Sequence, residues 1–255
     1  MMNNIHASCT LHRVSFISAN SCLLLVKLMS LEFKIKEDET LDGPDGLKIL
    51  QKKKGYRYSQ DSLQLVDFAS VRKNDEVIDL GTGCGVMALI LAKRGFGRRI
   101  VGLEVQEELA DLARRSVNLN GFQEKIEIVE GDIRTVKSLF PPSSFDYVIT
   151  NPPYIEAKSG LISPGSERAL ARHEILCDMN DILEAIKYLL KPSMRGSCVY
   201  PASRFDELII KAKKKRLEPK RARFVHPGPE EKAELAMVEF IKEGKSGLKV
   251  LPPLL

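Results

Sequence analysis

The chain has 255 residues, of which 44% are hydrophobic and 29% are charged, and this composition is typical of a soluble globular protein with one substantial core. Its longest apolar stretch outside the predicted core, residues 22–26, is far too short to cross a bilayer, which excludes a transmembrane protein. The net charge of +5 is modest, and basic residues cluster at 52–57 and at 211–223. The five cysteines are widely scattered: Cys9, Cys22, Cys84, Cys177 and Cys198. Because no two of them are spaced as a redox pair or as half a zinc site, the sequence indicates a cytoplasmic, metal-free protein.

The first thirty residues differ from the rest of the chain. They are rich in Ser and Asn, show no sustained hydrophobic period, and lack the basic start, long apolar run and cleavage site of a secretory signal. We predict that residues 1–30 are a disordered leader or result from an upstream start codon chosen instead of Met29.

Residues 31–70 are predicted to form a small extension in front of the main domain. Asp42 to Gly46 contain the Gly and Pro residues of a tight turn between two candidate strands, which favours a hairpin. Leu63, Val66 and Phe68 then follow at roughly helical spacing and predict a short helix. The main domain is expected to span residues 71–255.

From Asn74 onward, apolar strands alternate with amphipathic helices. Predicted strands lie at 77–80, 100–103, 126–129, 145–150 and 197–200. Predicted helices lie at 86–94, at 181–190, and around the face formed by Leu109, Leu112, Ala113 and Val117. This alternation predicts an α/β fold with a mostly parallel sheet covered by helices on both faces, and a ligand site at the carboxyl ends of the strands.

The last predicted strands are joined by short turns. They lie at 223–225, 237–241 and 248–251, and no helical period separates them. Antiparallel neighbours can be joined by such short connections, whereas parallel neighbours need crossovers. We therefore predict an antiparallel edge strand on a sheet of seven strands.

A glycine-rich turn follows the first predicted strand. After Asp79, the residues Gly81, Gly83 and Gly85 give the spacing Gly-x-Gly-x-Gly, which differs from the Gly-x-Gly-x-x-Gly of dinucleotide enzymes. Such a turn lets the backbone approach a ligand closely, although a tight turn without a ligand has the same composition.

Two acidic residues strengthen the ligand interpretation. Glu104 ends the second predicted strand, about twenty residues after the turn, where it can accept hydrogen bonds from ribose hydroxyls. Asp132 ends the third, where its carboxylate or the neighbouring backbone could bind an adenine amino group; the alternative is a solvated loop carboxylate. Together they predict a nucleoside-containing cofactor.

The tetrapeptide Asn151-Pro152-Pro153-Tyr154 follows the fourth predicted strand. Two consecutive prolines remove two backbone donors and hold their carbonyl acceptors in a rigid turn. Asn151 adds an amide oxygen, and Tyr154 adds a flat face on which a planar group can stack. Two acceptors on the hydrogens of an sp² amine direct its lone pair toward a methyl donor, so this turn predicts N-methylation.

With these motifs the sequence resembles the class I methyltransferases that carry an Asn-Pro-Pro-Tyr motif. It is most similar to the bacterial tRNA adenine-N6 methyltransferases that modify the adenosine next to the anticodon of valine tRNA. The resemblance runs from about Leu41 to the carboxyl terminus. Its further segments are Lys54 to Asp61, Ala171-Arg172-His173-Glu174 and Arg223 to Pro227.

The resemblance implies S-adenosyl-L-methionine as the cofactor, RNA as the partner and the Rossmann-like class I fold. Asp79 and the glycine turn would hold the methionine part of the cofactor, Glu104 its ribose and Asp132 its adenine. Asn151 and the Pro152 carbonyl would bind the target amine.

The resemblance also places residues 58–61, including Gln60 and Asp61, in a region that often closes over the cofactor. His173 is expected to be structural, because no partner for it is visible in the sequence and a histidine on a helix is more often structural than catalytic. No general base is needed, since the proton can leave the amine after methyl transfer.

Other functions remain open at this point. The same tetrapeptide serves protein glutamine-N5 methyltransferases that act on release factors, although residues 31–70 are too few for their usual amino-terminal helical domain. Small-molecule methylation, guanine methylation in ribosomal RNA and a catalytically silent RNA-binding scaffold are further alternatives. The basic run at 211–223 suggests phosphate binding, with a solvated helix face as the competing interpretation.

Overall fold

The computed structural model describes residues 35–152 and 178–255. The predicted leader, Pro153, Tyr154 and His173 lie outside the described residues. Ile35 to Leu255 form one compact unit, to which the described part of the predicted extension also belongs. Within the described ranges, no helix combines the length and apolar character needed to cross a membrane.

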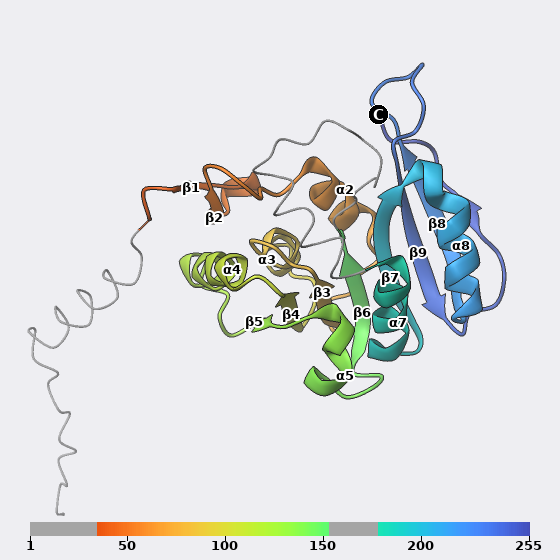
Figure 1. Cartoon of the computed structure of the whole chain (residues 1–255), viewed down its shortest axis with the longest axis horizontal. Coiled ribbons are helices and arrows are strands. Elements are labelled where there is room, and N and C mark those ends of the chain that lie inside the picture. The colour runs from red at the N-terminus through yellow and green to blue at the C-terminus, as the bar shows by residue number, and fades with distance from the viewer. Residues whose placement is uncertain (1–34, 153–177) are drawn as a thin grey trace, which may run out of the picture. The chain divides into compact units, whose positions relative to one another are not determined.

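The main sheet is mixed but mostly parallel (Figure 1), in the order β10-β8-β9-β7-β6-β3-β4-β5. A separate antiparallel pair, β1 with β2, forms the predicted hairpin. The strands of the described chain are β1 (Glu39–Asp42), β2 (Ile49–Lys52), β3 (Glu76–Leu80), β4 (Arg99–Glu104), β5 (Ile126–Glu130), β6 (Phe145–Thr150), β7 (Leu190–Pro201), β8 (Leu217–Val225), β9 (Leu235–Lys242) and β10 (Lys249–Val250).

Two details differ from the predicted sheet. Its described part has eight strands rather than seven, because the two-residue β10 pairs in parallel with β8. The antiparallel strand is β9, and it lies between β7 and β8 rather than at the edge. The connection at 226–234 is short enough to place β9 beside β8, but the sequence does not show that β9 also pairs with β7.

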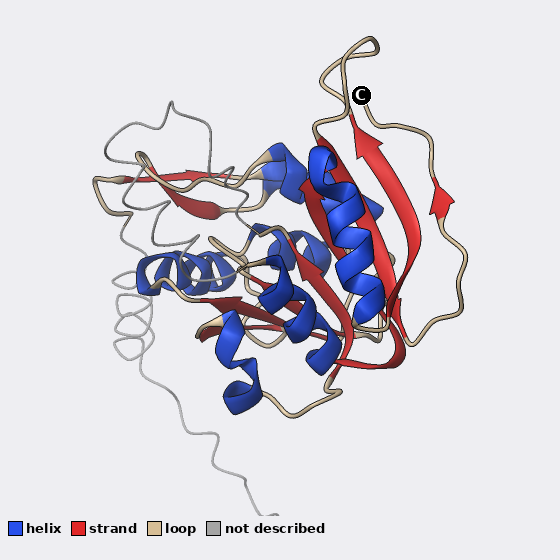
Figure 2. Ribbon diagram, turned by 45° about the vertical axis from the view of Figure 1, so that its right-hand side comes forward, coloured by secondary structure: helices blue, strands red, loops and turns tan. Residues whose placement is uncertain are grey.

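Helices cover both faces of the sheet (Figure 2). One buried cluster packs α2, α3 and Val117 of α4 against one face, and the other packs Val136 of α5 together with α7 and α8 against the opposite face. Alternating strand residues serve the two clusters: Val77 faces the first and Ile78 the second. The helices are α2 (Gln60–Phe68), α3 (Val86–Lys93), α4 (Glu107–Leu119), α5 (Val136–Leu139), α7 (Met179–Leu189) and α8 (Phe205–Lys214), with 3-10 turns η1 (Pro44–Gly46), η2 (Ile133–Thr135) and η3 (Ala202–Arg204).

The hairpin is fastened to α4. The backbone N–H of Leu50 donates to Ser116 Oγ at 2.9 Å, and that of Lys48 donates to Asn120 Oδ1 at 3.0 Å. Both acceptors lie on α4 or at its carboxyl-terminal end. These bonds fix the start of the segment that runs from β2 to α2.

The end of α2 is held by a buried ionic network. Glu239 of β9, which is 1% exposed, accepts from Arg221 Nε of β8 at 3.0 Å and from Tyr147 Oη of β6 at 2.9 Å. Arg221 also donates to Phe68 O and Ser70 Oγ, both at 2.7 Å. Because a buried charge is tolerated only when it is paired, this network joins three strands to the end of α2.

The basic run at 211–223 is not one solvated helix face. It is divided between the end of α8 and the strand β8, because the chain turns back between Lys214 and Leu217. Five of its cations lie in ion pairs within the described chain: Lys211 with Glu207, Lys213 with Glu218, Lys215 with Glu184, Arg216 with Glu243 and Arg221 with Glu239. The sequence did not reveal these partners, most of which come from other elements.

Candidate active site

Asp79, at the end of β3, lies beneath the glycine turn. It is fully buried, and its Oδ2 accepts from Thr82 Oγ1 at 2.7 Å. Its Oδ1 has no hydrogen-bond partner in the described part of the chain. Burial raises the pKa of Asp79 to about 7, with Glu104 raising it further and the Thr82 hydrogen bond opposing the shift.

The turn itself requires glycine at two positions that face the site. Gly81 and Gly83 have φ values of +73° and +57°, in the left-handed region that favours glycine. A Cβ on Gly81 would meet no atom within 4 Å, so this position faces open space. A Cβ on Gly83 would lie 2.6 Å from the ring of Tyr56.

Glu104, the last residue of β4, is held in place by backbone amides. Its Oε2 accepts from Gly83 N at 2.9 Å and its Oε1 accepts from Gln106 N at 3.0 Å. Each carboxylate oxygen keeps a second lone pair, which can accept from a ribose hydroxyl. The carboxylate is therefore positioned before any ligand arrives.

Asp132 follows β5 and caps η2 by accepting from Arg134 N at 2.8 Å. Arg134 also donates from Nε and Nη2 to the Asp132 carboxylate, at 3.0 and 2.6 Å to Oδ2. These hydrogen bonds hold the pKa of Asp132 below its usual value. An adenine amine at this end would have to share the carboxylate with Arg134 or use the neighbouring backbone.

Asn151 extends from the end of β6 toward α2. Its Nδ2 donates to the buried Ser62 Oγ at 2.9 Å, which fixes the orientation of the amide. The residue before Asn151, Thr150, is anchored to β3, because its Oγ1 donates to Leu80 O at 2.8 Å. The position of Asn151 is thus set by contacts with both β3 and α2.

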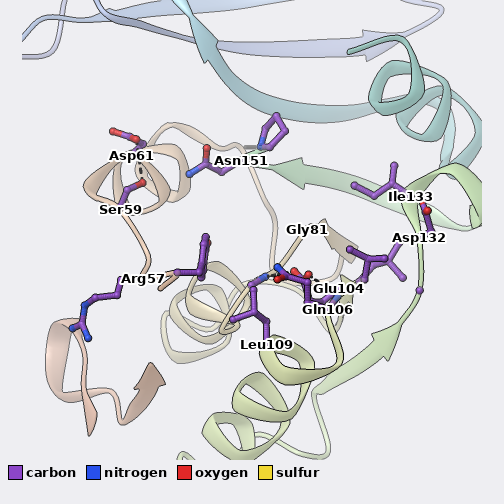
Figure 3. Close-up of a pocket in the computed structure, with 16 residues that line it drawn as sticks. Arg57, Ser59, Asp61, Gly81, Glu104, Gln106, Leu109, Asp132, Ile133 and Asn151 are labelled. Atoms are coloured by element: carbon purple, nitrogen blue, oxygen red, sulfur yellow. Dashed lines mark hydrogen bonds between the residues drawn. The ribbon is translucent and has the colours of Figure 1, made fainter. Parts of the chain in front are cut away.

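Apart from Asp79, which is buried beneath the turn and is not part of the lining, the predicted residues described above line one cavity of about 260 Å³ at the carboxyl ends of β3, β4, β5 and β6. Figure 3 shows Asn151 near Ser59 and Asp61 of the α2 side, Asp132 at the opposite end, and Glu104 between them. The lining consists of Tyr56, Arg57, Ser59, Asp61, Gly81, Gly83, Leu103, Glu104, Val105, Gln106, Leu109, Gly131, Asp132, Ile133, Asn151 and Pro152.

The remaining predicted residues are placed as follows. Asp61 lines the cavity and accepts from Ser59 Oγ at 3.0 Å, whereas Gln60 is exposed at the start of α2 and does not line it. Gly85 caps α3 away from the lining, where a Cβ would meet that of Ala113 at 3.3 Å. Tyr154 lies outside the described residues.

Sequence reasoning assigned no role to several lining residues, among them Tyr56, Arg57 and Ile133. Lys54 to Asp61 were singled out by resemblance, but only residues from Tyr58 onward were expected near the cofactor. Ser62 was also missed, because its contact with Asn151 joins residues 89 positions apart. The sequence offered one indication that Ser62 lies near the site: it directly follows Asp61, at the start of the predicted helix.

The residues present fit S-adenosylmethionine. The unpartnered Oδ1 of Asp79 would be satisfied by an N–H donor, and the open space at Gly81 leaves room for a ligand against the turn. The acidic groups Glu104 and Asp132 lie along the same cavity at the positions expected for ribose and adenine. In the described ranges, no group of three or more His, Cys, Asp or Glu could hold a metal ion.

Relatives with established names match over much of the chain. A tRNA1(Val) (adenine(37)-N6)-methyltransferase from Porphyromonas gingivalis is 32% identical over 165 residues, and the match covers 64% of this chain and 64% of the relative. The enzyme of the same name from Bacteroides thetaiotaomicron is 32% identical over 187 residues, which covers 72% of this chain and 77% of the relative. The chain thus spans 64% of the length of the Porphyromonas relative.

Solved structures agree on the fold. A predicted O-methyltransferase from Agrobacterium tumefaciens superimposes with a TM-score of 0.59 at 23% identity, covering 76% of this chain and 86% of that one. An S-adenosylmethionine-dependent methyltransferase from Aquifex aeolicus superimposes with a TM-score of 0.52 at 16% identity, covering 71% of this chain and 89% of that one. A family model described as a methyltransferase domain matches residues 71–238. The chain therefore belongs to the methyltransferase domain family and has its class I Rossmann-like fold.

Proposed function

We propose that this protein transfers a methyl group from S-adenosylmethionine to the exocyclic amine of adenine in RNA, in a tRNA near its anticodon, in the cytoplasm. The observation that carries the proposal is the orientation of Asn151 by Ser62 at the rim of the cavity, directly before Pro152. The tRNA adenine-N6 methyltransferases at about 30% identity support the choice of substrate.

The cavity residues would divide the work as follows. Glu104, and Asp132 or the backbone beside it, would hold the ribose and adenine of the cofactor, which supplies an electrophilic methyl group when bound. Asn151 Oδ1 and the Pro152 carbonyl would accept the two hydrogens of the target amine, so that its lone pair points into the cavity. The amine becomes a strong acid once methylated and can lose its proton to water.

The test is single-turnover methylation of unmodified tRNA and, in parallel, of a release factor, with the methylated product identified by mass spectrometry. We expect N6-methyladenosine in tRNA. Asn151→Ala should lower turnover by about a hundredfold or more with cofactor affinity nearly unchanged, because the acceptor acts mainly as charge develops. Asn118→Ala, an exposed position on α4, is the matched control and should retain activity.

Methylated glutamine in the release factor, with no labelled tRNA, would replace the RNA proposal with the protein-glutamine alternative. A protein that binds RNA and cofactor but labels neither substrate would be a scaffold. Wild-type turnover by Asn151→Ala would contradict the proposed role of the amide even if tRNA is methylated.

A further inference from the structure

Tyr56 lies directly on the glycine turn. It lines the cavity, and a Cβ on Gly83 would lie 2.6 Å from its Cε1 and 2.7 Å from its Oη. The ring therefore occupies the space that a side chain at Gly83 would fill. Tyr56 comes from the segment between β2 and α2, so this wall of the cavity is supplied from outside the βα units.

The hydroxyl of Tyr56 lies near the carboxylates of Asp79 and Glu104. Gly83, which it contacts, donates its N–H to Glu104, the proposed ribose ligand. Burial raises the pKa of the Tyr56 hydroxyl, and the negative charges of Asp79 and Glu104 raise it further, so the phenol stays neutral with both carboxylates nearby. A ligand that joins the ribose position at Glu104 to the turn above Asp79 must pass beside this ring.

The charges around the cavity favour a cationic ligand. Its lining includes three acidic residues, Asp61, Glu104 and Asp132, and one basic residue, Arg57. Asp132 is paired with Arg134, so Asp61 and Glu104 carry this argument. The guanidinium of Arg57 is directed to the hairpin, where it donates to Asp42 Oδ2 at 3.0 Å and to Thr40 Oγ1 at 2.8 Å. Figure 3 shows Arg57 pointing away from Glu104.

From this arrangement we infer that Tyr56 is a specificity residue that makes the cavity bind the sulfonium cofactor S-adenosylmethionine more tightly than its neutral thioether product, S-adenosylhomocysteine. An aromatic face attracts a cation through its ring quadrupole, and the attraction increases when the cation is removed from water. The product has lost that positive charge and keeps only the dispersion contact. The inference rests on the cofactor assigned in the proposed function.

The test compares three ligands by calorimetry in the absence of RNA: S-adenosylmethionine, S-adenosylhomocysteine and sinefungin, whose amine replaces the methylated sulfonium with another cation. Tyr56→Phe keeps the ring and should keep the wild-type preference for the two cations. Tyr56→Leu removes the ring and should lower the affinity ratio of cation to thioether by about threefold to tenfold. Tyr188→Leu makes the same change on α7, outside the lining, and should leave the ratio unchanged.

The hydroxyl end of Tyr56 lies against the glycine turn, but the residue as a whole is 43% exposed, so Tyr56→Leu removes little from the core. Thermal melting checks that the variant is folded. Tyr56→Gln provides a second ring-free variant if Tyr56→Leu is unstable. An unchanged ratio in a folded ring-free variant, with both ligands still bound by the wild type, would overturn this inference alone. A wild-type protein that binds neither S-adenosylmethionine nor its product would overturn the proposed function as well.

Discussion

Replacing Asp79 with Asn would remove a buried negative charge while keeping the side chain's size and an oxygen that can accept from Thr82. Burial raises the pKa of this carboxyl from 3.8 to about 7. At 1.36 kcal/mol per pKa unit, the charged form destabilises the ligand-free fold by roughly 4 kcal/mol. This penalty is absent below about pH 4, where the carboxyl is protonated in both states, grows as the pH rises, and is complete above about pH 7.

Urea unfolding of the ligand-free protein at several pH values measures the effect. We expect Asp79→Asn to be about as stable as the wild type near pH 4 and more stable by up to roughly 4 kcal/mol at pH 8. Asp206→Asn changes an exposed carboxylate and serves as the control. S-adenosylhomocysteine should raise the melting temperature of the wild type more than that of Asp79→Asn at pH 8, because its ammonium group offsets the buried charge. A stability difference that does not vary with pH would refute the reasoning.

Three further predictions concern the cavity wall and the amide of Asn151, for which we propose a catalytic role. Gly83→Ala should lower the affinity for S-adenosylhomocysteine at least tenfold in calorimetry, because its Cβ would clash with Tyr56. Adding Tyr56→Ala should restore part of the loss. Equal affinities of the single and the double variant would contradict the clash. Tyr56→Trp would introduce the chain's first tryptophan, so a change in its fluorescence on ligand titration is expected, and an unchanged spectrum would place the ring outside the ligand site. Ser62→Ala should reduce single-turnover rates on tRNA about tenfold with unchanged cofactor affinity, because Asn151 loses one hydrogen-bond partner that orients its amide; a wild-type rate would rule out this role.

The features predicted well are those encoded within a few residues. The apolar run before Asp79 and the glycines after it define both the strand and the turn. Glu104 ends β4 and Asn151 directly follows β6, and the neighbours of both strands run in parallel. Parallel strands bring such ends to one edge of a sheet, so the sequence alone is enough to place these residues around one cavity.

The features that were missed depend on contacts between distant residues. Nothing near Glu239 in the sequence indicates that Arg221 will neutralise its charge or that Tyr147 will donate a hydrogen bond to it, because those partners lie on separate strands. The run at 211–223 contains eight basic residues, which suggested a phosphate-binding surface. Five of them pair with acidic residues in the fold, and the sequence alone does not show that these partners lie opposite them. Tyr56 escaped assignment because its contact with Gly83 depends on how the hairpin packs, which no local pattern records.

The anchoring of the hairpin and of α2 limits how the cavity can open. Leu50 is bonded to α4 just before the connecting segment, and Phe68 and Ser70 are bonded to Arg221 after it. The connection at 53–59 therefore joins two immobilised elements and includes Tyr56, Arg57 and Ser59 of the cavity wall. Ligand entry on this side has to proceed by rotation of these side chains or by bending of seven backbone positions, so mutations that stiffen this short connection would slow exchange of cofactor and product without altering the sheet.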